Sequence, residues 1–166
     1  MMTIRRFREG DWPRILPFLR DAVEAGDAFA AAPDSSEADL RHDWLVAPRA
    51  TYVACADDGV IVGSYILKAN RPGLGSHVCT CEYVVAQEAR GQGVGTLMCE
   101  HSQLEAAAMG FRAMQFDLVV STNDRAVRLW QKLGFVVVGI LPHAFRHRRF
   151  GYVDAVVMYK EIVTPD

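Results

Sequence analysis

The sequence contains no apolar run that approaches the roughly 20 residues needed for a membrane-spanning helix. Its first residues, Met-Met-Thr-Ile-Arg-Arg-Phe, have no long apolar segment behind their charges, so they do not resemble a signal peptide. We therefore expect no membrane contact and a cytoplasmic location.

The sequence also lacks an excess of positive charge. Its 18 Lys and Arg residues are balanced by 20 Asp and Glu residues, which gives a formal net charge of −2. Proteins that bind nucleic acid usually present a basic face to the phosphate backbone. This balance therefore argues against a nucleic-acid partner.

Cysteine is scarce, and the four cysteines lie in apolar runs: Cys55, Cys79, Cys81 and Cys99. The pair Cys79-x-Cys81 has no second pair at the spacing of a zinc site. We therefore expect buried free thiols in a reducing compartment and no bound metal.

Apolar residues are plentiful: the chain of 166 residues is 51% hydrophobic and 23% charged. This composition is ample for a buried core, and the length is that of one ordinary domain. No internal repeat or linker composition interrupts the chain, so we predict a single domain over residues 1–166.

Hydrophobic periodicity predicts the element order β-α-α-β-β-β-α-β-α-β-β. The predicted strands cover residues 3–7, 51–56, 60–67, 77–86, 112–120, 135–141 and 152–160. The predicted helices run from Asp11 to Gly26, from Ser35 or Ser36 to the residues before Pro48, from Thr96 to Gly110 and over 125–133. This order lacks the strict alternation of a doubly wound fold, so it predicts an α/β fold with a mixed sheet.

Local signals add detail to these elements. Asp11 is expected to cap the first helix, and Gly26 to end it in a left-handed conformation. Gly63 indicates a bulge or a close approach within its strand. The stripe predicted to be buried on the third helix is Val94, Leu97, Met98, Leu104 and Ala108.

A glycine-rich turn follows the fourth predicted strand, as Arg90-Gly91-Gln92-Gly93-Val94-Gly95. A strand, a glycine loop and a helix N-terminus together form an anion site, because the N–H groups of the first helical turn are unpaired. The chain has no Gly-Lys pair, which excludes a Walker loop. Thr96 stands where a dinucleotide fingerprint requires its third glycine, which excludes that motif too.

The motif R-x-x-G-x-G at Arg90–Gly95 resembles the pyrophosphate-binding motif of the GCN5-related N-acetyltransferase (GNAT) family. The segment from Asn123 to Phe135, with Trp130 and Gly134, is similar to the second hallmark of that family. The resemblance covers nearly the whole chain. Its last two strands look like those of a bacterial branch that acts on small molecules, and they are somewhat similar to fungal enzymes that acetylate toxic proline analogues.

The resemblance implies a GNAT fold with a splayed central sheet and acetyl-CoA as cosubstrate. The residues expected to cradle its pyrophosphate are Arg90, Gly91, Gln92, Gly93, Val94, Gly95 and Thr96. The backbone of Val84, Val85 and Ala86 is expected to bind the pantetheine arm and to polarise the thioester carbonyl. Asn123 and Trp130 are expected to contact the cofactor, with Asn123 also capping its helix.

The catalytic base is predicted to be Glu82, which comes shortly before the cofactor-binding backbone; His77, earlier on the same strand, is an alternative. Trp130 stands where many family members have a tyrosine that protonates the leaving thiolate, and an indole N–H is no practical acid. Tyr83, Tyr65 and Tyr152 are candidate replacements, and Tyr83 and Asn123 complete the predicted catalytic set.

The acceptor pocket is predicted to include Phe29, His77 and Trp130, although Phe29 is also suited to pack on the core. A basic loop over 142–151 carries His143, Arg146, His147, Arg148 and Arg149. This loop is suited to bind an acceptor carboxylate or the 3′-phosphate of CoA, or else to remain solvated. Acceptor choice is expected to lie in three variable loops, over residues 26–34, 70–75 and 142–151.

These expectations predict an N-acetyltransferase that moves an acetyl group to a primary or secondary amine of a small molecule, such as an amino acid or a toxic analogue. The amine attacks directly in a ternary complex. Two alternatives remain open: acetylation of a protein N-terminus or lysine, and a non-catalytic acyl-CoA-binding module. A homodimer is common among proteins of this kind and is expected here.

Overall fold

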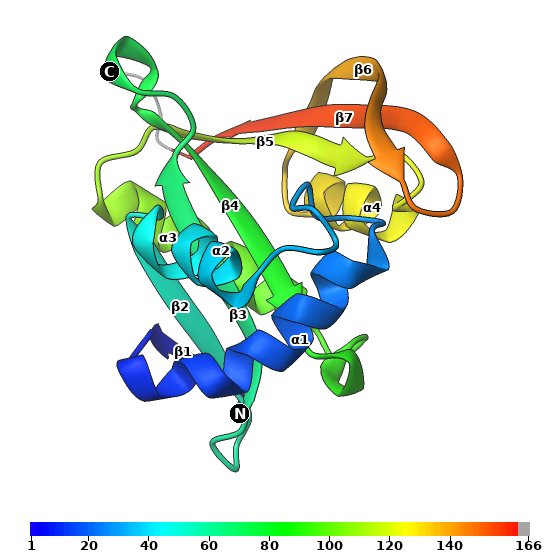
Figure 1. The fold of residues 1–166 in the computed structure, drawn as a ribbon. Coiled ribbons are helices and arrows are strands. Elements are labelled where there is room, and N and C mark those ends of the chain that lie inside the picture. Colours follow the sequence, from blue (N-terminus) through cyan, green and yellow to red (C-terminus); the bar gives the residue numbers. More distant parts are fainter. Residues whose placement is uncertain (163–166) are drawn as a thin grey trace.

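A computed structural model describes residues 1–162, which form a seven-stranded sheet in the order β1-β2-β3-β4-β5-β7-β6 (Figure 1). The strands are β1 Thr3–Arg6, β2 Ala50–Cys55, β3 Ile61–Ala69, β4 Val78–Val85, β5 Ala113–Val120, β6 Val136–His147 and β7 Gly151–Glu161. The helices are α1 Trp12–Ala25, α2 Glu37–Arg41, α3 Val94–Ala108 and α4 Asp124–Lys132. Short helical segments are η1 Glu9–Asp11, η2 His42–Val46, η3 Gly73–Gly75 and η4 Gln87–Ala89. The predicted α/β fold with a mixed sheet is confirmed.

The sheet separates two apolar cores. On one face, α1 and α2 cover a cluster that includes Ile15, Leu19 and Trp44, all at most 2% exposed. On the other face, α3 buries Met98 and Cys99 against the sheet, and α4 packs against the same core. Figure 1 shows α1 and α2 in front of the strands and α3 behind them. Within residues 1–162 no helix is both long and apolar enough to cross a membrane.

Strands β4 and β5 are the parallel pair of the sheet, and they separate soon after they begin. Their register contains only two pairs, Val78 with Ala113 and Cys79 with Met114, although each strand has eight residues. Figure 1 shows β5 turning away from β4 toward β7. The expected splay is therefore present, and it leaves one edge of β4 without a partner strand.

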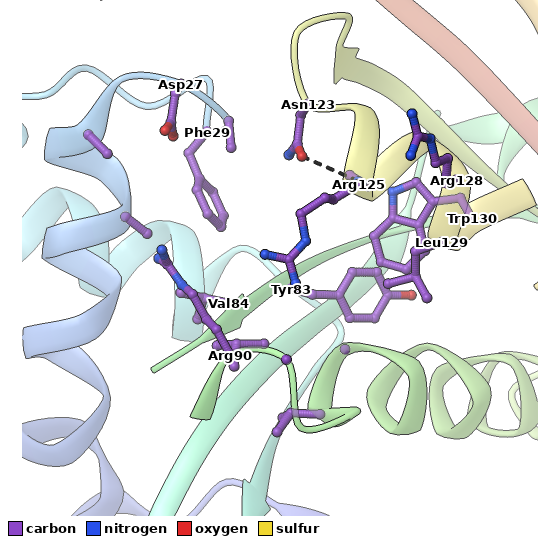
Figure 2. Close-up of a pocket in the computed structure, with 18 of the residues that line it drawn as sticks. Asp27, Phe29, Tyr83, Val84, Arg90, Asn123, Arg125, Arg128, Leu129 and Trp130 are labelled. Carbon is purple, nitrogen blue, oxygen red and sulfur yellow. Dashed lines mark hydrogen bonds between the residues drawn. The ribbon is translucent and has the colours of Figure 1, made fainter. Parts of the chain in front are cut away.

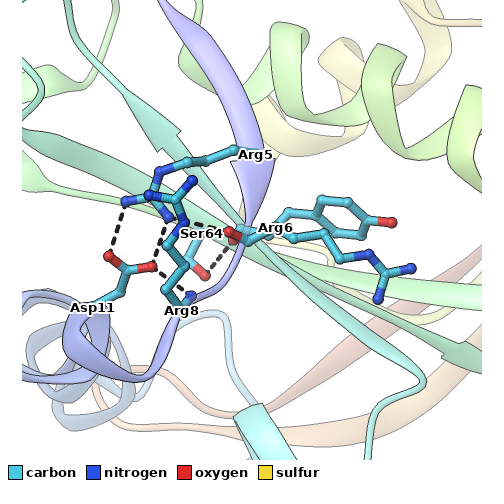
Figure 3. A network of polar contacts seen from close by, with 6 residues as sticks. Arg5, Arg6, Arg8, Asp11 and Ser64 are labelled. Carbon is cyan, nitrogen blue, oxygen red and sulfur yellow. Dashed lines mark hydrogen bonds and ion pairs between the residues drawn. The ribbon is translucent and has the colours of Figure 1, made fainter.

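Asp11 precedes α1 as expected, but its carboxylate makes no capping bond to that helix. It accepts two hydrogen bonds from the Arg5 guanidinium, at 2.8 and 2.9 Å, and one from the Arg8 N–H at 2.7 Å (Figure 3). Asp11 therefore fastens β1 to the start of α1. The left-handed end of α1 at Gly26, with φ of 62°, is confirmed.

Strand β6 is longer than predicted, and the prediction of a loop over 142–151 is wrong for most of that segment. β6 continues to His147, which pairs with Gly151 of β7. Pro142 suggested a turn because it cannot donate to a ladder, yet an edge strand tolerates it. The register between β6 and β7 shifts between Leu141 and Phe145, which accommodates Pro142 and the positive φ of 51° at His143.

The predicted apolar stripe of α3 is partly wrong. The helix begins at Val94, two residues earlier than expected, and Val94 and Met98 are buried. Leu104 is 72% exposed, since Ala106 and Ser102 face the core in its place. The close approach expected at Gly63 is confirmed: a Cβ there would lie 3.0 Å from Val94 and 3.1 Å from Met98. All four cysteines are buried and free, as predicted.

Candidate active site

A cavity of about 1060 Å³ opens where β4 and β5 separate (Figure 2). Five parts of the chain line it: the end of α1 with the turn after it, β4, the glycine motif, α4, and the β6–β7 hairpin. The lining residues used below are Asp27, Phe29, Tyr83, Val84, Val85, Arg90, Gly91, Gly93, Val94, Gly95, Thr96, Asn123, Arg125, Arg128, Trp130, His147, Arg149 and Phe150. The cavity therefore joins the glycine motif to most of the residues predicted for the site.

The glycine motif forms a cradle of backbone N–H groups. Gly91 and Gly93 adopt positive φ angles of 77° and 82°, and a Cβ at either position would meet no atom within 4 Å. The first hydrogen bond of α3 runs from the Leu97 N–H to the Gly93 carbonyl, at 3.0 Å. Among the described residues, the N–H groups from 91 to 96 donate to no backbone carbonyl. Such a nest at a helix N-terminus favours an anion.

Cationic side chains surround this cradle. Arg90, Arg125 and Arg128 line the cavity, and Figure 2 shows the Arg90 and Arg125 guanidinium groups directed into it from opposite sides. Gln92 does not line the cavity, since its side-chain amide donates to the Glu88 carbonyl at 3.1 Å. The cradle and its arginines fit a diphosphate, which bears negative charge on oxygens that accept hydrogen bonds.

The structure shows which of the three residues predicted to bind the pantetheine arm has a free backbone at the edge of β4. The Ala86 N–H donates to the Val62 carbonyl at 2.8 Å, so the prediction that this N–H is free to bind a ligand is wrong. Because backbone groups alternate along an antiparallel ladder, the N–H and carbonyl of Val84 also point to β3. Those of Val85 and Tyr83 point toward β5, where no strand pairs with them. Val85 is therefore the predicted residue whose backbone is available to an extended ligand.

Asn123 caps α4, as expected: its side-chain oxygen accepts from the Ala126 N–H at 3.3 Å. It also lines the cavity, and Figure 2 shows its side chain above the open space. The amide nitrogen of the side chain is left as a donor when the oxygen caps the helix. A contact of Asn123 with a ligand stays a prediction.

Trp130 lies on α4 and forms part of the cavity wall. Its ring centroid is 5.1 Å from that of Tyr83 and 5.1 Å from that of Phe116. Phe29, on the opposite wall, lies 6.3 Å from the Trp44 ring in an edge-on contact. Phe29 therefore does both things foreseen for it, since it packs on the core and lines the cavity.

Tyr83 presents its ring to the cavity while its hydroxyl lies under α3. The hydroxyl is 2.7 Å from the Ser102 Oγ, and Ser102 itself donates to the Cys99 carbonyl at 2.8 Å. The Tyr83 hydroxyl must therefore be the donor to Ser102. Burial raises the pKa of Tyr83 well above its ordinary value. This geometry argues against Tyr83 as the acid that was predicted.

The other two tyrosines considered as acids do not line the cavity. Tyr65 is fully buried, and its hydroxyl is 2.7 Å from the His101 Nδ1. Tyr152 is 67% exposed, near the start of β7. Within residues 1–162 Tyr83 is the one tyrosine that lines the cavity, and its hydroxyl bonds Ser102, so no tyrosine there acts as the acid in place of Trp130.

Glu82 lies on the face of β4 that packs toward α1 and α2. It is not part of the cavity wall, but Val84, two residues along on the same face, is. Burial raises the pKa of the Glu82 carboxyl, Lys68 lowers it, and Asp43 raises it. A raised pKa suits a base that works near neutral pH. The role of Glu82 stays a prediction, with a water molecule needed to span the gap.

His77 lies outside the cavity, so its place in the acceptor pocket is wrong. Its carbonyl accepts from the Arg112 N–H at 2.8 Å, at the end where β4 and β5 begin side by side. Seven residues of extended strand separate it from Val84, which is about 23 Å at 3.3 Å per residue. The splay opens at the other end of β4, a fact that strand spacing alone does not reveal.

Sequence reasoning missed the part of the hairpin that completes the cavity. His147 was placed in a basic loop suited to an acceptor anion, to the 3′-phosphate of CoA or to solvent; in the structure it is only 8% exposed and lines the cavity with Arg149 and Phe150. The Arg148 N–H donates to the Gly26 carbonyl at 2.9 Å, and its guanidinium donates to the Glu24 carbonyl. The hairpin tip is thereby fastened to the end of α1. The run of basic residues was the available signal, but its position came from tertiary contacts.

No group of three or more His, Cys, Asp or Glu residues is placed to hold a metal ion within the described part of the chain. The features that remain for function are the backbone cradle, its arginines, the free edge of β4 and a second compartment of the cavity beside the hairpin. Together they suit a diphosphate-bearing ligand with an extended arm.

Comparisons with known proteins agree with this geometry. The sequence model of the acetyltransferase (GNAT) family matches residues 14–135. A solved GCN5-related N-acetyltransferase from Kribbella flavida is 43% identical, with a TM-score of 0.91 over 96% of this chain and 97% of that chain. A phosphinothricin acetyltransferase from Sinorhizobium meliloti, solved with acetyl-CoA, is 21% identical, with a TM-score of 0.86 over 98% and 89% of the two chains.

Two curated relatives are also similar to this chain. The N-acetyltransferase aca1 of Schizosaccharomyces pombe is 35% identical over 98 residues, which cover 58% of this chain but only 47% of the yeast protein. The peptidyl-lysine N-acetyltransferase YjaB of Salmonella typhimurium is 28% identical over 84% of this chain and 86% of its own. The chain therefore belongs to the GNAT family of N-acetyltransferases, acyltransferases that use acetyl-CoA.

Proposed function

We propose that the protein transfers the acetyl group of acetyl-CoA to a primary or secondary amine of a small molecule. One observation carries the proposal: a cradle of unpaired N–H groups lies at the mouth of the gap between β4 and β5. That gap has a free strand edge, and the hairpin and the end of α1 line the same cavity.

The residues that would hold acetyl-CoA follow from their positions. The N–H groups from 91 to 96 and the Arg90, Arg125 and Arg128 side chains suit the diphosphate. The free backbone of Val85 suits the amides of the pantetheine arm and, as a donor, the thioester oxygen. When bound, acetyl-CoA supplies an activated acyl group on a thiol leaving group.

The protein's own chemistry is to orient the amine, remove its proton and exclude water. Glu82, through a water molecule, is the proposed base. Because no tyrosine hydroxyl among residues 1–162 faces the place of Trp130, we propose that the thiolate leaves without a side-chain acid. A thiol with a pKa of about 8.5 is a good enough leaving group for this.

The walls of the cavity support a small acceptor. Arg148 fixes the hairpin against Gly26, so the compartment beside Phe29 and His147 is bounded on several sides. The likeness to phosphinothricin acetyltransferases supports the same acceptor class. The relative YjaB, which acts on peptidyl lysine, keeps protein acetylation as the second candidate.

A screen with acetyl-CoA tests the proposal. Release of free thiol is measured with a panel of amino acids, amino-acid analogues, polyamines and lysine-containing peptides. We expect release that depends on a small amine, at rates well above hydrolysis. Release with peptides alone would favour protein acetylation. No release with any amine, despite binding of CoA, would favour the non-catalytic binding module.

The homodimer and the cytoplasmic location expected from the sequence remain part of this proposal. Sedimentation velocity at several protein concentrations measures the oligomeric state. A monomer at every concentration would contradict the homodimer without affecting the proposed chemistry.

A further inference from the structure

His147 ends β6 with its ring held between two phenylalanines. Its ring centroid is 4.7 Å from that of Phe150 and 6.4 Å from that of Phe145. The His147 Nδ1 lies 3.0 Å from the Arg149 nitrogen and 3.1 Å from the Phe150 nitrogen. Both contacts are backbone N–H groups that donate to the ring, so the orientation of the imidazole is fixed.

These two bonds also fix the tautomer of His147. A ring nitrogen that accepts hydrogen bonds carries no proton, so the proton of the neutral imidazole is on Nε2. The Nε2 atom has no hydrogen-bond partner among the described residues. Because no side-chain nitrogen or oxygen in this part of the chain is both fully buried and unpartnered, Nε2 must reach accessible space. His147 is also one of the residues that line the cavity, which is the accessible space assigned to Nε2 below.

The N–H donor of His147 has a suitable electrostatic setting. Arg149 lines the cavity beside it and carries a positive charge. Asp27 lines the cavity from the turn after α1, and Figure 2 shows its carboxylate at the edge of the open space. The contact between Arg148 and Gly26 holds these two walls together. The compartment thus offers a donor and a cation on one wall and an anion on the other.

We infer that His147 determines acceptor specificity by donating its Nε2–H to the carboxylate of an α-amino acid, an inference that rests on the proposed function. An ionised carboxylate is an acceptor only, so its oxygen can accept the Nε2–H of neutral His147. The positive charge of Arg149 compensates the negative charge of the carboxylate. Asp27 complements the ammonium group of the incoming acceptor before its proton is removed. An amine without a carboxylate leaves the Nε2–H without its partner, which disfavours binding.

The wild-type protein gives the first test. Thiol release from acetyl-CoA is measured with a panel of α-amino acids, each paired with the amine that has hydrogen in place of the carboxylate. The amino acid of an active pair should have a kcat/KM about 10- to 100-fold above that of its amine, as expected for a charge-assisted hydrogen bond. Equal values for both members of every pair would overturn the inference.

Two variants of His147 assign the effect to the ring nitrogen. In His147→Asn the side-chain oxygen can still accept from the hairpin N–H groups, but the donor at the Nε2 position is lost. In His147→Gln a donor remains near that position. We expect His147→Asn to abolish the preference for the amino acid, mainly through its KM, and His147→Gln to retain part of it. The KM for acetyl-CoA should stay within about twofold, since His147 is not one of the residues that form the cradle.

Several outcomes would contradict the inference. An equal loss of kcat/KM for the amino acid and its amine in His147→Asn would indicate a structural role only. Thiol release with other amines but with no amino acid would overturn the inference while the proposed acetyl transfer stands. Absence of release with every amine would contradict the proposed function itself, and the inference with it.

Discussion

At the scale of single residues, the site depends on where hydroxyl, carboxylate and ring groups point. Tyr83 lies on the strand predicted for it, but its hydroxyl points to Ser102 under α3. The ring of Trp130 packs on Tyr83, so the pair forms a wall rather than an acid. Sequence patterns placed both residues on the correct elements. They did not give the direction of a polar atom, because that direction is set by packing between elements.

Glu82 yields a prediction about the pH dependence of the reaction. As the base, Glu82 must be ionised, and burial raises its pKa above the ordinary value. Activity should therefore rise with pH through this raised pKa. The titration of Glu82 then gives the acidic limb of the kcat/KM profile. In Glu82→Gln, kcat should fall about 100-fold and that limb should disappear.

Glu88→Gln is the matched control for this prediction, since Glu88 is exposed and lies outside the cavity wall. Its pH profile should follow that of the wild-type protein. An unchanged kcat and an unchanged acidic limb in Glu82→Gln would remove Glu82 from the mechanism and leave solvent as the base.

At the scale of elements, local signals predicted most starts and ends correctly. Gly26 ends α1 and Asn123 caps α4 because each has a local backbone or side-chain reason to do so. The end of β6 was missed because its pairing with β7 depends on a distant partner, while Pro142 suggested a turn. Leu104 was misplaced because a helical stripe gives a period but not the direction of the core.

The contact between β1 and α1 gives a prediction about stability. The Arg5 hydrogen bonds are the main cause that lowers the pKa of Asp11, a residue only 5% exposed. A carboxyl group whose pKa is depressed on folding stabilises the protein above its unfolded pKa of about 3.9, and this stabilisation is lost as pH falls through the folded pKa. Asp11→Asn should therefore lower the free energy of unfolding by about 1–3 kcal/mol at pH 7.

Urea denaturation at pH 7 and at pH 3 or below measures this effect. The difference between Asp11→Asn and the wild-type protein should shrink at the lower pH, where the wild-type carboxylate gains its proton. Asp34→Asn is the control, since Asp34 is exposed and should show little change at either pH. A difference that is equal at both pH values would mean that charge is not the source of the stabilisation.

At the scale of the whole molecule, the function depends on a gap in the sheet that no local signal describes. The glycine motif predicted the anion cradle because its residues are adjacent in the chain. Acceptor choice was expected in the loops that hold Asp27 and His147, but their meeting in one compartment could not be predicted in this way, since they come from opposite ends of the sequence. Their proximity follows from the hairpin tip that Arg148 fastens to Gly26.

The central claim is that the cradle around Gly93 binds the diphosphate of acetyl-CoA, and Gly93→Glu tests it with a closely matched control. Gly93 and Gly59 both have φ of 82°, and a Cβ at either would meet no atom within 4 Å. Glutamate at each position therefore causes similar backbone strain and adds the same charge. Gly59 lies in the turn between β2 and β3 and is not part of the cavity wall.

The most direct measurement is the affinity for CoA by isothermal titration calorimetry, with circular dichroism to show that each variant is folded. The Gly93→Glu protein should bind CoA about 100-fold or more weakly, because the carboxylate opposes the diphosphate and removes charge-assisted hydrogen bonds. The Gly59→Glu protein should bind like the wild-type protein. Wild-type affinity in a folded Gly93→Glu protein would contradict the cofactor site and the function built on it.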